Sequence, residues 1–121
     1  MKTTVRHFEI FKSECLRWIG IFGLKDWRIE FSNEEYVGGG ARASIWFNCS
    51  DRAAHIYLEP AWCDEALSDK NLRLSAFHEV CEILIAPLRD KCSAREYSEN
   101  DLSEAGHTII RILESVLYPK Y

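Results

Sequence analysis

The N-terminal part of the chain carries a single apolar stripe. Its members recur three or four positions apart and are Phe8, Phe11, Cys15, Trp18, Ile19 and Phe22. This spacing places them on one face of a helix, and Gly23 follows where a C-terminal glycine cap is expected. The pattern predicts an amphipathic helix over residues 3–22.

The period changes to two after this helix. Trp27, Ile29 and Phe31 alternate with charged residues, which predicts a strand with one buried face. Two later segments, ARASIWFN and AAHIYLE, are rich in β-branched and aromatic residues and are joined by the short turn CSDR. They predict an antiparallel hairpin, so three strands should form one small sheet.

Alternation within the second arm of that hairpin assigns its faces. Ala54, Ile56 and Leu58 form the predicted inner face, so His55 should point to the opposite one. We therefore interpret His55 as a surface residue and not as a ligand. The glycine run 38–40 lacks the lysine and the following helix of a phosphate-binding loop, and we interpret it as a hairpin connection.

Two further helices are predicted in the C-terminal half. The first begins at about Asn71 and should end or bend near Ala86, because Pro87 follows. The second is indicated by Ser98 with an aspartate three residues later, a start similar to a capping box, and should run to about Tyr118. Neither a repeat nor a linker interrupts this order.

The expected fold is therefore one α+β domain over residues 1–121. It consists of an N-terminal helix, a small three-stranded antiparallel sheet and two C-terminal helices. A length of 121 residues suits one core, and 47% hydrophobic with 28% charged residues is typical of a globular protein.

Composition also excludes several classes of function. The chain has no apolar run of 18 residues, so we expect no membrane span, and a net charge of −4 without a basic cluster argues against nucleic-acid binding. The start MKTTVRHFEI lacks the features of a secretory signal, and the five cysteines form no CxxC pair. We expect a cytoplasmic protein with reduced, mostly buried cysteines.

Candidate chemistry is concentrated in the segment AFHEVCEILIA. Apart from the thiol of Cys81, its only ionisable groups are His78, Glu79 and Glu82, and the surrounding positions are apolar. Burying an unpaired carboxylate costs several kcal/mol, so these groups need a metal, each other or a cation. On a helix His78 and Glu82 share one face, and Glu79 lies about 100° around the axis.

The segment AFHEVCEILIAPL resembles the active-site helix of small prophage-encoded zincin-like proteins of the minimal gluzincin type. The resemblance implies a zinc-dependent metallopeptidase-like protein in the cytosol of a bacterial host, acting on a peptide or protein. It also implies that His78 and Glu82 bind the zinc ion and that Glu79 is the general base. Glu82 stands where the family has a second histidine, giving HExxE, which puts catalysis in doubt.

A later helix supplies the third zinc ligand in this family, and two residues compete for that position. With His107, the ligands are two histidines and one carboxylate, as in an ordinary gluzincin. With Glu104, they are one histidine and two carboxylates, so a bound zinc would acidify its water less. Both residues lie on the polar side of the last predicted helix, where they could also be solvated.

Three functions compete on this sequence. The first is a zinc metallopeptidase-like domain. The second is a catalytically inactive zincin scaffold that serves as a phage accessory protein-binding module, and the third is a purely structural partner-binding domain. A thiol nucleophile formed by Cys81 with His78 is disfavoured, because a reactive thiolate needs an electropositive setting and this one is flanked by acids.

Overall fold

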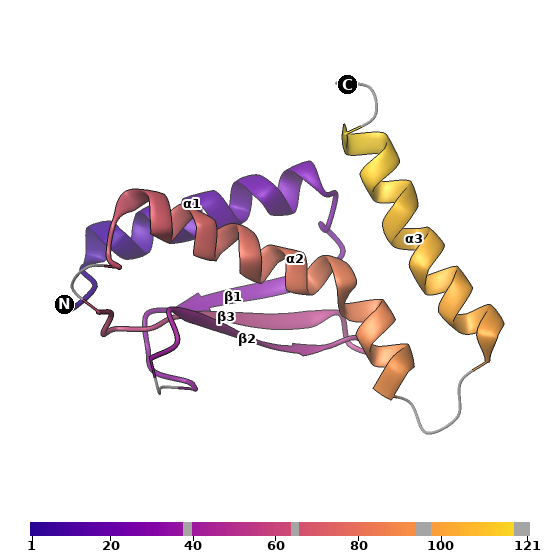
Figure 1. Cartoon of the computed structure of the whole chain (residues 1–121), viewed down its shortest axis with the longest axis horizontal. Coiled ribbons are helices and arrows are strands. Elements are labelled where there is room, and N and C mark those ends of the chain that lie inside the picture. The colour runs from indigo at the N-terminus through magenta and orange to yellow at the C-terminus, as the bar shows by residue number, and fades with distance from the viewer. Residues whose placement is uncertain (38–39, 64–65, 94–97, 118–121) are drawn as a thin grey trace.

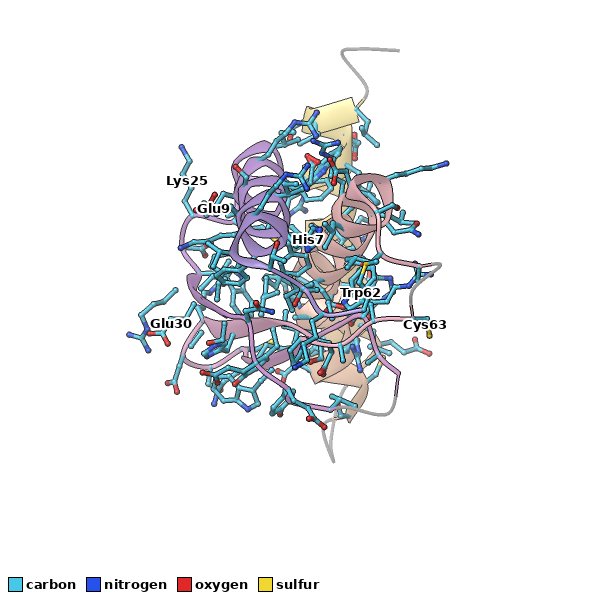
Figure 2. The ribbon with its side chains drawn as sticks, turned by 90° about the vertical axis from the view of Figure 1, so that its left-hand side faces the viewer. His7, Glu9, Lys25, Glu30, Trp62 and Cys63 are labelled. Carbon is cyan, nitrogen blue, oxygen red and sulfur yellow. The ribbon has the colours of Figure 1, made fainter. Side chains whose placement is uncertain are left out.

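The computed structural model describes residues 1–37, 40–63, 66–93 and 98–117. In chain order the elements are α1 (Val5–Ile21), β1 (Arg28–Ser32), β2 (Ala43–Asn48), β3 (Ala53–Leu58), α2 (Asp69–Ser93) and α3 (Glu99–Leu117). Helices α1 and α2 lie side by side over one face of the sheet (Figures 1 and 2), and α3 packs against α2. The predicted α+β arrangement is confirmed.

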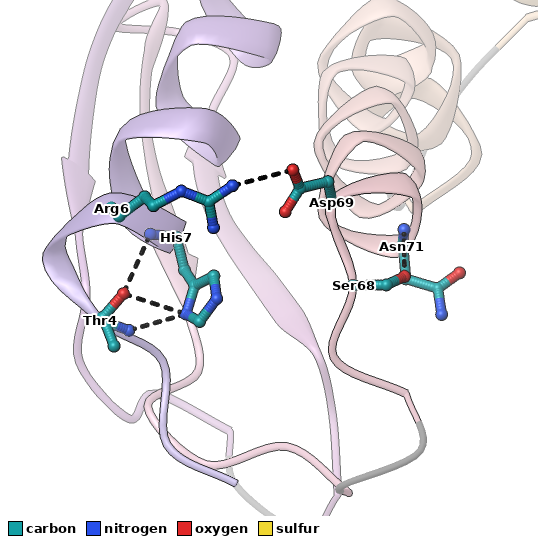
Figure 3. A network of polar contacts seen from close by, with 6 residues as sticks. All are labelled: Thr4, Arg6, His7, Ser68, Asp69 and Asn71. Atoms are coloured by element: carbon teal, nitrogen blue, oxygen red, sulfur yellow. Dashed lines mark hydrogen bonds and ion pairs between the residues drawn. The ribbon is translucent and has the colours of Figure 1, made fainter.

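Helix α1 starts at a capping box that uses a histidine. Thr4 Oγ1 accepts a hydrogen bond from the His7 backbone N–H at 3.3 Å, and His7 Nδ1 accepts one from the Thr4 N–H at 3.0 Å (Figure 3). Arg6 forms an ion pair with Asp69 at 3.0 Å and so joins the start of α1 to the start of α2. At the other end Gly23 has a φ of 68°, as its predicted role in the cap requires.

The sheet is mixed, so the prediction of a purely antiparallel sheet is wrong. Strand order is β1-β3-β2, with β2 and β3 antiparallel as expected but β1 parallel to β3. The two-residue period fixes which face of a strand is buried, but it carries no information on the order or direction of strands. The centre is taken by β3, whose Ala54, Ile56 and Leu58 are all buried.

The core lies between the sheet and the two helices. Its fully buried side chains come from α1, β3 and α2, and the largest are Phe11, Cys15, Ile56, Leu58, Leu72, Val80 and Ile83. Each buried aliphatic or aromatic side chain contributes about 1.5–3 kcal/mol relative to an exposed one. Trp18 and Phe77 add an edge-to-face contact at 4.7 Å between ring centroids, which fastens the end of α1 to α2.

Helix α2 is longer at both ends than its pattern predicts. It starts at Asp69, after Ser68 Oγ accepts a hydrogen bond from the Asn71 N–H at 3.1 Å. The predicted end near Ala86 is wrong, because the helix continues through Pro87 to Ser93. A proline removes one backbone hydrogen bond, and the burial of apolar side chains in the preceding turn compensates for the loss.

Helix α3 has the predicted capping box. Ser98 Oγ accepts from the Asp101 N–H at 3.1 Å, and the carboxylate of Asp101 accepts from the Ser98 N–H at 3.4 Å. Only Ala105 is buried in this helix, and its predicted end at Tyr118 lies outside the described residues, as do Gly38 and Gly39 of the predicted glycine connection. None of the described helices is both long and apolar enough to cross a bilayer.

Candidate functional site

A cleft opens between α2 and the edge strand β2. It has a volume of about 300 Å³. One wall is the segment 41–43, which leads into β2, and the other is formed by Leu74, Ser75, His78 and Glu79 of α2. The two motif residues adjacent in sequence, His78 and Glu79, therefore face the same space.

His78 is the exposed member of the motif. Its side chain is 69% accessible, and its Nε2 lies 3.6 Å from Oε1 of Glu82, one helical turn further on. The predicted proximity of these two side chains is observed. Two ligands of one tetrahedral zinc ion, each at about 2.0–2.1 Å, would be about 3.3 Å apart, so this separation is close to that of a ligand pair.

Glu79 is the buried member, with 6% of its surface accessible. Burial, and secondarily the charge of Glu82, raises the pKa of the Glu79 carboxyl from its ordinary value of 4.5 to about 7. Within the described residues Glu79 has no hydrogen bond or ion pair. This environment therefore favours the protonated carboxyl, which carries no charge and needs no counter-ion.

Glu82 is paired with a cation, Arg89. Its Oε2 forms an ion pair with Nη1 of Arg89, whose guanidinium also lies 5.7 Å from the ring centroid of Phe47 in β2. Sequence reasoning missed Arg89, although seven residues make almost two full helical turns and place it on the same face as Glu82. Arg89 is therefore the cation that partners Glu82, whereas Glu79 has none among the described residues.

Glu104 and His107 do not join this group. Both are exposed on α3, and the Nδ1–H of His107 donates to the Ser103 carbonyl at 2.7 Å, a contact within its own helix. Over residues 1–37, 40–63, 66–93 and 98–117 no three His, Cys, Asp or Glu side chains are placed so that they could hold a metal ion.

Among the described residues, the donor set therefore does not fit a catalytic zinc ion, which needs three protein ligands and an open fourth position. His78 and Glu82 supply two donor atoms, and Glu82 is already bound to Arg89. The roles of His78 and Glu82 as zinc ligands and of Glu79 as a general base remain predictions from the resemblance.

The cysteines carry no reactive thiolate at the site. Burial, and then the charge of Glu82, raises the pKa of the Cys81 thiol, which opposes the formation of a nucleophile. All five cysteines are free, as expected, but Cys63 and Cys92 are exposed and only Cys15 is fully buried. The expectation that most of them are buried is wrong, because the connection after β3 and the end of α2 lie at the surface.

Comparison with known proteins finds no match, whether the chain is scanned against protein-family models or compared with curated proteins and solved structures. The resemblance to zincins consequently rests on the HExxE helix and the element order alone.

Proposed function

We propose that the chain is a catalytically inactive zincin-like scaffold that binds an extended segment of a peptide or protein. The binding site is the cleft between β2 and α2. Its position carries this proposal, because β2 is an edge strand of the described sheet and the segment 41–43 that leads into it forms one wall. An extended peptide adds to such an edge through its main chain, and alternate side chains enter adjacent pockets.

The walls of the cleft determine what it accepts. Leu74 is 56% exposed and offers an apolar surface, whereas Arg42 offers a cation whose guanidinium lies 5.5 Å from the ring centroid of Trp62. Glu79, at the base of α2's wall, is a hydrogen-bond donor in its protonated form. A segment with an apolar side chain and a carboxylate or carbonyl oxygen is therefore the preferred ligand.

This function includes a cellular setting. We propose that the protein acts in the cytosol of a bacterial host as a phage accessory protein, as the resemblance to zincins implies, and exposed free cysteines such as Cys63 and Cys92 are compatible with a reducing compartment.

Selection from a library of random decapeptides displayed on beads tests this function. Selected peptides are then titrated against Leu74→Asp and against Leu16→Asp, which alters an equally exposed leucine on α1, outside the cleft. Leu74→Asp should weaken binding at least tenfold, and Leu16→Asp should leave it unchanged. A library without binders, or two variants with the same effect, contradicts the proposal.

A zinc-dependent metallopeptidase-like function is the second candidate. It is favoured by the 3.6 Å separation of His78 Nε2 and Glu82 Oε1 and by the acid–base character of Glu79 beside them. Zinc binding to the folded state would raise the melting temperature in proportion to the logarithm of zinc concentration, and Glu82→Ala would abolish the rise. An unchanged melting temperature leaves the metal-free binding module as the supported function.

A further inference from the structure

A second histidine lies on the other face of the sheet, away from the helices. Oγ of Ser32 and Nε2 of His55 are 2.6 Å apart, and Nδ1 of His55 is 3.8 Å from Oε2 of Glu30. Strand register produces this row, because Glu30 is directly opposite His55 and Ser32 occupies the next outward position of β1. Hydroxyl, imidazole and carboxylate in this order are the groups of an acyl-transfer nucleophile, its base and its orienting acid.

Aromatic stacking fixes the orientation of the imidazole. The His55 ring stacks on Tyr57 with centroids 4.2 Å apart and an interplanar angle of 8°, and Tyr57 stacks in turn on Tyr36 at 4.5 Å and 8°. In the tautomer with a proton on Nδ1, Nε2 accepts the Ser32 hydroxyl and the Nδ1–H faces Glu30. Positioning of a base before the substrate arrives is what such catalysis requires.

A hollow beside Glu30 and His55 provides space for the aryl part of a substrate, and Ser32 lies next to it through its contact with His55. It has a volume of about 230 Å³, and its lining includes Glu30, His55, Tyr57 and Trp46, the last of which is 45% exposed. An aryl group can stack on the exposed ring of Trp46. With Glu30 included, two carboxylates and one arginine line the hollow, which favours a neutral or cationic compound over an anionic one.

We propose that the outer face of the sheet is an acyl-transfer site for neutral aryl esters. Ser32 is the nucleophile, His55 the general base, and Glu30 a positioning residue that acts through His55. Ser32 Oγ attacks the ester carbonyl carbon while its proton passes to Nε2 of His55. The bond from that carbon to the aryl oxygen breaks, and His55 returns the proton to the leaving oxygen.

Water completes the cycle by the same route. His55 removes a proton from water, the resulting attack breaks the acyl bond to Ser32, and the proton returns to Ser32 Oγ as the carboxylic acid leaves. No oxidant, metal or second protein is needed for this balance.

A fluorophosphonate probe tests the nucleophile directly. Ser32 Oγ should attack phosphorus, fluoride should leave, and the adduct should be found on Ser32 by mass spectrometry of peptides. General-base assistance contributes about 100-fold or more, so His55→Gln should lower the rate of labelling by about that factor. Glu30→Gln should lower it about tenfold, and Glu30→Asp should restore part of the loss.

The chain contains its own control. Ser103 Oγ lies 3.2 Å from Nδ1 of His107 on α3, but no carboxylate is paired with that histidine among the described residues. Ser103 should therefore remain unlabelled. Unlabelled Ser32, equal labelling of Ser103, or a rate unaffected by His55→Gln would overturn the assignment. Should His55→Gln fail to fold, Ser32→Ala replaces it, and persistence of probe incorporation in that variant is the contrary outcome.

Discussion

Two histidine-centred clusters lie on opposite sides of the sheet, and they differ in how they are held. His78 is mostly exposed, and the carboxylate next to it is shared with Arg89. His55 is 25% exposed and is held by Ser32 and by the ring of Tyr57, with the Glu30 carboxylate 3.8 Å from its Nδ1. A residue that belongs to a recognisable sequence motif is therefore not always one whose side chain is held in a fixed position.

Their acids differ in the same way. Glu79 in the cleft is buried and favours the protonated form, whereas the side chain of Glu30 is 74% exposed and faces the solvent. The cleft therefore combines a buried acid with an exposed imidazole. The outer face combines a solvent-exposed acid with a fixed imidazole, which is the better arrangement for a general base.

Replacement of Glu79 should have the largest effect on stability. Because the folded-state pKa is about 7 and the ordinary value is 4.5, folding favours the protonated form. The contribution of Glu79 to stability should be greatest below about pH 4.5 and should fall as pH rises to about 7, by up to about 3 kcal/mol. Glu79→Gln should remove this fall and be more stable than the wild type at pH 8. Urea unfolding of both proteins from pH 4 to 8 measures how the free energy of unfolding changes with pH.

The control for that series is Glu104→Gln, which alters an exposed carboxyl on α3. It should leave the dependence of the unfolding free energy on pH unchanged. A Glu79→Gln variant that retains the slope between pH 4.5 and 7 would assign the titration to another group.

Substitutions in the two histidine clusters should have different effects on the free energy of unfolding. Ser32→Ala removes the 2.6 Å hydrogen bond to a partly buried imidazole and should cost about 1 kcal/mol. His78→Gln alters an exposed side chain and should change the free energy of unfolding by less than about 0.5 kcal/mol. Thermal unfolding of both variants gives the comparison, and equal effects would contradict the difference in how the histidines are held.

The ion pair of Arg89 with Glu82 should contribute less to the free energy of unfolding than the hydrogen bond between Ser32 and His55. A double-mutant cycle with Arg89→Met and Glu82→Gln should give a coupling energy of about 0.5 kcal/mol, because the guanidinium side chain is 55% exposed and water screens the pair. Addition of 1 M salt should reduce the coupling further. A coupling near zero at low salt would mean that Glu82 is free to bind another cation.

The smallest expected effect is that of zinc. With two donors in place and one of them bound to Arg89, added zinc should leave the melting temperature unchanged. Arg89→Met frees the Glu82 carboxylate and serves as the sensitised comparison. A rise in the wild type that Glu82→Ala removes would favour the metallopeptidase-like function over the binding module.

The part of the candidate site that could be predicted from the sequence lies within a single helix. His78 and Glu82 are four residues apart, and helical geometry alone brings them together. Arg89 lies seven residues after Glu82 and therefore on the same face of the helix, although Pro87 between them predicts that the helix ends. Whether Glu104 and His107 reach His78 depends on how α3 packs against α2. The spacing of residues within one helix does not determine that packing.

The outer row could not be predicted because it depends on strand register. The alternation of buried and exposed positions correctly predicts that His55 points away from the core, but it does not identify the residues that contact His55. Glu30 meets His55 only because β1 is parallel to β3 in this particular alignment, and a shift of one residue would place Ile29 opposite it instead. Contacts between strands distant in sequence require knowledge of order, direction and register together.

The position of β1 also has a consequence for how the protein is made. Its only neighbour in the described sheet is β3, which follows about 20 residues later, whereas β2 and β3 are joined by a short turn. At roughly 5–20 residues per second, β1 leaves the ribosome about one to four seconds before its partner exists. Assembly of the sheet thus begins with the β2–β3 hairpin, and the earliest strand to be synthesised is the last to be incorporated.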